Sequence, residues 1–92
     1  GGVLTKPIVF NGSELRINFS TSAVGSVRIE IQDAQGVPFS GYTFDDMDPI
    51  YGDKLDQNVE WSHHRNLSEL SGVEMKLRFE LRDADVFSFR FV

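Results

Sequence analysis

The chain has 92 residues, a formal net charge of −5 and no cysteine, and 40% of its residues are hydrophobic. Its length fits a single domain, residues 1–92, and its apolar content is too high for an intrinsically disordered chain. The acidic balance argues against a nucleic-acid partner and against docking on an anionic membrane, because both need clustered Lys and Arg. The lack of cysteine excludes disulfides and thiol nucleophiles.

Apolar and polar residues alternate along most of the chain, which is typical of β-strands with one buried face. The first half predicts a short opening strand that ends at an Asn-Gly-Ser turn, two longer strands, and a tight turn in which Gly36 supplies a positive φ. These elements are expected at residues 7–10, 14–20, 27–32 and 33–36.

The second half begins with an irregular segment, residues 39–53. A strand then places Leu55, Val59 and Trp61 on one inward row. The remaining elements are a single helical turn, a strand, a hairpin and a final Phe-rich strand, expected at residues 66–70, 75–82, 83–85 and 87–91.

Seven or eight short strands with almost no helix predict an all-β fold, an antiparallel β-sandwich of jelly-roll-like or immunoglobulin-like topology. Most of the 8 phenylalanines fall on inward rows and are expected in the core. The chain starts at Gly1-Gly2 without Met and stays apolar up to Val92. We therefore expect the C-terminal module of a longer chain, secreted or periplasmic if a leader has been removed.

Aspartates gather in the irregular segment, at Asp45, Asp46, Asp48 and Asp53. Carboxylate oxygens are hard ligands that suit Ca²⁺, so these four are candidate ligands of a structural calcium ion. Their spacing is not that of an EF-hand. Aspartates also end strands and cap turns through hydrogen bonds to the backbone, and this second interpretation is favoured.

Aromatic side chains in and near the same segment are candidates for glycan binding, since exposed rings can carry the apolar face of a sugar. They are Tyr42, Tyr51 and Trp61, with Asp53 and Asn58 as polar partners. Trp61 shares its row with Val59, which favours a core position. Tyr51, in the irregular segment, is the best candidate for an exposed ring.

The sequence does not predict catalysis. A glycosidase needs two carboxyl groups about 5–9.5 Å apart in a cleft, for which a small sandwich has little material. His63 and His64 are neighbours whose side chains point to opposite faces of a strand, so they do not predict a zinc site. No Gly-x-Ser-x-Gly motif is present. We therefore expect a protein that is not an enzyme.

Two stretches are more specific than this general pattern. Residues 20–38 contain Ser-Val-Arg-Ile-Glu-Ile-Gln-Asp-Ala-Gln-Gly-Val-Pro, and residues 83–91 read Asp-Ala-Asp-Val-Phe-Ser-Phe-Arg-Phe, preceded by residues 72–79. Together they resemble the C-terminal β-sandwich module that follows the five-bladed propeller in bacterial proteins similar to glycoside hydrolase families 32 and 43. The resemblance runs over residues 6–91 and includes the Asp-Pro-Ile-Tyr-Gly-Asp loop.

This resemblance implies that the catalytic carboxylates lie in the propeller, so no catalytic residue carries over to this chain. It implies a non-catalytic accessory module of a carbohydrate-active bacterial protein, which packs on or assists a neighbouring domain of its parent chain. Two alternatives remain. One is a carbohydrate-binding module that uses residues 45–53 with Tyr51, and the other is a calcium-stabilised cell-surface interaction module.

Overall fold

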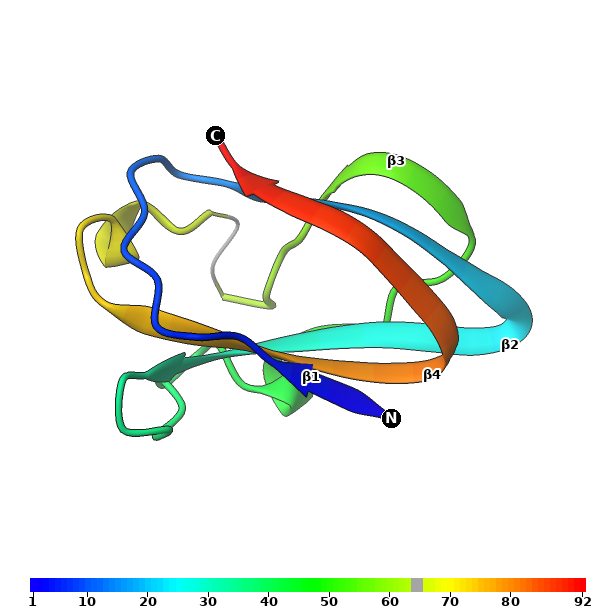
Figure 1. The fold of residues 1–92 in the computed structure, drawn as a ribbon, viewed down its shortest axis with the longest axis horizontal. Helices are drawn as coiled ribbons and strands as arrows, with labels where there is room; N and C mark the ends of the chain where they lie inside the picture. The colour runs from blue at the N-terminus through cyan, green and yellow to red at the C-terminus, as the bar shows by residue number, and fades with distance from the viewer. Residues whose placement is uncertain (64–65) are drawn as a thin grey trace.

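The computed structural model describes residues 1–63 and 66–92 (Figure 1). The fold is all-β, one antiparallel sheet of four strands in the order β1-β4-β2-β3. The elements are β1 (Gly2–Leu4), β2 (Leu15–Asp33), β3 (Asp53–Asn58), β4 (Met75–Phe91) and two short 3₁₀ helices, η1 (Phe44–Asp46) and η2 (Ser68–Leu70). Within the described residues, no helix has the length and apolar character that crossing a membrane requires.

β2 and β4 form one long antiparallel ribbon that bends in its middle. The pairing jumps from Thr21 opposite Ala84 to Ser26 opposite Arg82, so that β2 has extra residues against Asp83 alone. Asp83 adopts a left-handed φ of 45° at this point. Both strands turn back at the right of Figure 1, and the two halves of the ribbon lie on opposite sides of the molecule.

Each half of the ribbon carries a short third strand. β1 pairs with the first half of β4, where Gly2 lies opposite Glu80. β3 pairs with the first half of β2, where Arg16 lies opposite Asn58. The bent ribbon and these two strands thus place sheet on both sides of the core (Figure 1).

The core lies between the two halves of the ribbon. Alternate residues of β2 and β4 point into it, because successive side chains of a strand lie on opposite faces. Side chains from the connecting segments fill the open sides. The buried apolar residues are Phe10, Leu15, Ile17, Phe19, Val27, Ile29, Ile31, Tyr42, Met47, Val59, Trp61, Leu67, Leu70, Met75, Leu77 and Phe79.

The all-β antiparallel prediction is confirmed, but the sandwich of seven or eight strands is not, since the described residues form one sheet of four strands. Two pairs of predicted strands are the halves of β2 and of β4. The expected hairpin at residues 83–85 is wrong, because the chain bends there and continues as one strand. The opening strand is reduced to one bridge at Ile8. The turn with Gly36 at φ 89° and the helical turn within residues 66–70 are confirmed.

The predicted inward position of Leu55 is also wrong, since its side chain is exposed. The pairing of β3 jumps from Gln57 opposite Ile17 to Lys54 opposite Phe19. This bulge inserts one residue and reverses the facing of the side chains before it. Leu55 therefore lies on the outer face although it has the same parity as the buried Val59.

Asp56, in the same bulge, connects three strands by ion pairs. Its carboxylate accepts hydrogen bonds from Arg90 of β4, at 2.8 and 2.9 Å, and from Arg16 of β2 at 3.0 Å. Arg16 is also held by Glu14, at 2.7 Å. The bonds from Arg90, and then those from Arg16, lower the pKa of Asp56 to about 2.

This shift predicts a loss of stability in acid. A carboxyl group whose pKa is lower in the folded state stabilises it above the unfolded pKa, about 3.9 for Asp, and this stabilisation fades as the pH falls towards 2. We expect the urea midpoint of the wild-type chain to fall between pH 5 and about pH 2 more steeply than that of Asp56→Asn. Equal slopes for the two chains would contradict the prediction.

Candidate interaction surface

The irregular segment covers the outer edge of the second half of β2. Ile50 exchanges two backbone hydrogen bonds with Val27, at 2.8 and 3.0 Å, and Tyr42 accepts one from Ile31 at 3.0 Å. Between these bonds, the Ile29 N–H donates to the sulfur of Met47 at 3.1 Å. A sheet edge left open can pair with other chains, so the segment closes this edge of the sheet.

Two of the predicted glycan-binding rings, Tyr42 of this segment and Trp61 beyond it, lie in the core. Trp61 Nε1 donates to the carbonyl of Ile29 at 3.0 Å, and the Trp61 ring meets Tyr42 edge-on at 5.5 Å. The Tyr42 hydroxyl donates to Glu69 at 2.5 Å, and burial, followed by this bond, raises the pKa of Tyr42. Neither ring presents a face to a sugar, whereas Tyr51 is exposed as predicted.

The four candidate calcium ligands have separate surroundings. Asp46 accepts hydrogen bonds from the N–H and hydroxyl of Thr43 and so caps η1. The exposed carboxylate of Asp45 lies 3.8 Å from Arg28. Asp53 starts β3 opposite Ser20. Among the described residues, no three acidic, histidine or cysteine side chains are placed to hold one metal ion. The calcium ion itself stays a prediction.

Asp48 lines a polar hollow of about 390 Å³ together with two other candidates, Asn58 and Trp61. Asn58 Nδ2 donates to Glu60 at 3.2 Å, while its buried Oδ1 accepts no hydrogen bond from the described residues. Tyr51 and Asp53 are not among the described residues that line this hollow. Of the two histidines that were considered as zinc ligands, His63 is exposed and His64 lies outside the described residues.

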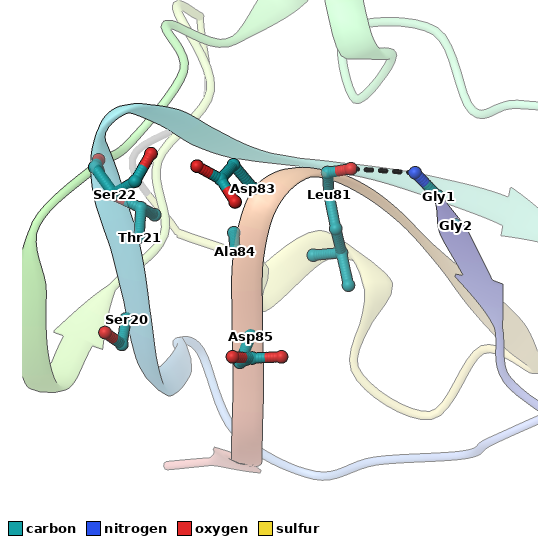
Figure 2. Close-up of a pocket in the computed structure, with 9 residues that line it drawn as sticks. All are labelled: Gly1, Gly2, Ser20, Thr21, Ser22, Leu81, Asp83, Ala84 and Asp85. Atoms are coloured by element: carbon teal, nitrogen blue, oxygen red, sulfur yellow. Dashed lines mark hydrogen bonds between the residues drawn. The ribbon is translucent and has the colours of Figure 1, made fainter.

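A second polar hollow lies at the bend of the ribbon, as Figure 2 shows. It measures about 640 Å³ and is lined by hydroxyl side chains of β2 and by the carboxylates of Asp83 and Asp85 in β4. The amino group of Gly1 donates to the carbonyl of Leu81 at its rim, at 2.9 Å (Figure 2). We call this hollow the acidic hollow.

An apolar groove of about 200 Å³ adjoins the acidic hollow, and Leu81 lines both. Phe79 and Leu81 line it from the first half of β4, and β1 contributes Val3. The second half of β4 contributes Val86, Phe87 and Phe89. Phe87 is 68% exposed and Phe89 is 38% exposed, so the prediction that this row points into the core is wrong for Phe87 and only partly right for Phe89.

The groove follows a sheet edge with no partner strand among the described residues. β1 covers β4 only as far as Leu81, which accepts from and donates to Gly1. Beyond the bend, β4 pairs with β2 on one side. We call the other side of residues 85–91 the open edge. The Phe89 ring contacts Phe79 at a tilt, with 5.8 Å between ring centres, and Phe91 edge-on at 6.1 Å, so aromatic rings line it.

The sequence held one signal for this surface, a Phe-Ser-Phe-Arg-Phe run without proline or lysine. Natural edge strands usually carry such blocking residues. The pattern alone does not distinguish an edge strand from a central strand. Comparison with protein-family models, curated proteins and solved structures finds no match for this chain.

Proposed function

We propose that this chain is a non-catalytic module that packs on a neighbouring domain of its parent chain through the apolar groove beside the open edge. The observation that supports this is the gathering of exposed Val3, Phe87 and Phe89 around one groove. Burying such a patch is favourable by about 25 cal/mol per Å² of apolar surface. Contiguous exposed apolar patches mark interaction sites in soluble proteins.

The contrast between the sheet edges adds to this proposal. The irregular segment covers the second half of β2, and β1 and β3 cover two further stretches. The outer edges of β1 and β3 are themselves short, 3 and 6 residues, and β3 carries charged residues and a bulge. The open edge also has a bulge at Phe87 and two charged residues, Asp85 and Arg90, but Arg90 pairs with Asp56 and no described segment covers this edge.

The experiment compares oxidation of side chains by hydroxyl radicals in the parent chain and in the 92-residue chain. We expect Phe87 and Phe89 to be oxidised several-fold more slowly in the parent chain, because the neighbouring domain covers them. Tyr51 is the internal control, since it is 69% exposed and lies in a different segment. Equal oxidation of Phe87 in the two chains, or hydrolysis of glycosides by the 92-residue chain, would contradict the proposal.

A variant separates docking from folding. Phe87→Ser changes a largely exposed side chain, so the free energy of unfolding of the 92-residue chain should change by about 0.5 kcal/mol or less. In the parent chain, the same change should restore rapid oxidation of Phe89. A large loss of stability in the 92-residue chain would show that Phe87 serves the fold instead.

A second candidate function is glycan binding at the polar hollow of Asp48, Asn58 and Glu60. The observation that favours it is the buried Asn58 Oδ1, an acceptor without a described donor. A sugar hydroxyl could donate to it. A glycan array with no hit for the 92-residue chain, or an unchanged hit for Asn58→Ala, would contradict this function.

A further inference from the structure

The open edge presents backbone hydrogen-bonding groups as well as side chains. Glu14 and Val92 exchange two hydrogen bonds, each of 3.0 Å. In an antiparallel pair, residues that exchange such bonds alternate with residues whose N–H and C=O point away. The regular register from Val92 back to Ser88 therefore directs the N–H and C=O of Phe91 and Phe89 away from β2.

The groove beside these groups has room for alternate side chains of an added strand. Its volume is about 200 Å³, and its lining residues are apolar except for Thr5 and Ser88. Every second residue of a strand faces the same side. A strand placed along the open edge would therefore insert its apolar residues over Phe79 and Leu81.

Charge distinguishes the two ends of the groove along the open edge. The acidic hollow continues the groove beyond Leu81 and is lined by Asp83 and Asp85. A strand that pairs antiparallel with β4 runs along the open edge from Phe91 towards Asp85, so its C-terminal end lies near Asp85. A cationic residue at the C-terminal end of such a strand would lie near Asp85, whereas the Asp83 carboxylate points towards Ser22 of β2 (Figure 2).

We infer that the open edge binds an extended apolar segment ending in lysine or arginine, which adds to β4 as an antiparallel fifth strand. This inference rests on the proposed function, for it names the part of the neighbouring domain that docks. A second copy of the chain is a poorer occupant, since each copy carries a net charge of −5. Like-charged partners repel, and opposite charge favours association.

The test uses a capped seven-residue peptide of alternating threonine and valine that ends in lysine, and a matched peptide that ends in glutamate. Amide exchange of the 92-residue chain is followed by NMR. At about ten times its dissociation constant, the lysine peptide should slow the exchange of Phe89 and Phe91 about tenfold. The amides of Arg90 and Val92 are controls, because they already face β2.

The charge at the end of the strand is tested by changing the last residue of the peptide and Asp85 of the protein, separately and together. The glutamate peptide should bind up to about fivefold more weakly than the lysine peptide, the usual range for an exposed ion pair. Asp85→Asn should reduce this difference. Equal binding of both peptides to the wild-type chain would overturn the cationic end of the inference.

Strand addition can fail while the proposed function stands. If Phe87 is protected in the parent chain but neither peptide slows the exchange of Phe89 and Phe91, the neighbouring domain packs on side chains alone. Strand addition is then wrong. If the 92-residue chain is a dimer in light scattering, with the Phe89 and Phe91 amides protected before any peptide is added, a second copy occupies the edge and the inference is overturned.

Discussion

Trp61→Ala is expected to lower the free energy of unfolding by about 3–5 kcal/mol. The side chain is 2% exposed and packs edge-on against Tyr42. Its removal leaves a cavity and also removes the donor that satisfies the Ile29 carbonyl at the edge of β2. Since domains of this size are stable by about 5–15 kcal/mol, the change removes a large part of the total.

Urea unfolding followed by circular dichroism measures this loss, because the chain has a single tryptophan and the variant has no intrinsic tryptophan signal. The matched control is Tyr51→Ala, a second large aromatic residue that is 69% exposed. It should change the free energy of unfolding by about 0.5 kcal/mol or less. Equal effects of the two variants would mean that Trp61 does not occupy the core.

Gly25→Ala is expected to lower the free energy of unfolding by about 3 kcal/mol, the upper range for overpacking. A Cβ at this position would lie 2.5 Å from the carbonyl oxygen of Asp83 and 2.6 Å from that of Arg82. Both contacts are with backbone, which cannot rotate away as a side chain can. Relief requires β2 and β4 to separate at the bend.

The control for this prediction is Val24→Ala, in the same bend. Val24 is 88% exposed, so its truncation should change the midpoint of urea unfolding very little. If Gly25→Ala were as stable as Val24→Ala, the close approach of the two strands at the bend would be wrong. The same measurement therefore tests the geometry that turns the ribbon back over the core.

Strand positions were predictable because the alternation that defines them is local. The rows that include Ile17, Ile29 and Leu77 are buried as their parity predicts. The turn at Gly36 was also predictable, since its conformation depends on adjacent residues.

Strand connectivity was not predictable in the same way. The Asp-Ala-Asp sequence at residues 83–85 has the composition of a turn, yet the chain continues through it as one strand. What permits this is the close approach of Gly25 from β2, a contact between residues far apart in the sequence. The facing of side chains around a bulge was also not predictable. The bulge in β3 exposes Leu55, although the alternating pattern of the sequence does not change there.

The candidate site, too, was only partly predictable from the sequence. Composition drew attention to the aspartate-rich segment and to its aromatic residues. In the structure, Asp46 caps η1 and Tyr42 lies in the core, while the segment as a whole covers an edge of β2. The exposed Phe87 was predicted to be buried, so the apolar surface of the proposed function came from the structure alone.

The amino-acid sequence was sufficient for the all-β class, for most core residues of β2 and β4, and for the acidic, cysteine-free composition. Only the tertiary structure decided which strand edges are covered and which rings are exposed. The physical reason is that side-chain alternation is a property of each strand alone. An edge is covered by hydrogen bonds from distant segments, such as those of Ile50 to Val27, and no local pattern specifies where those segments lie.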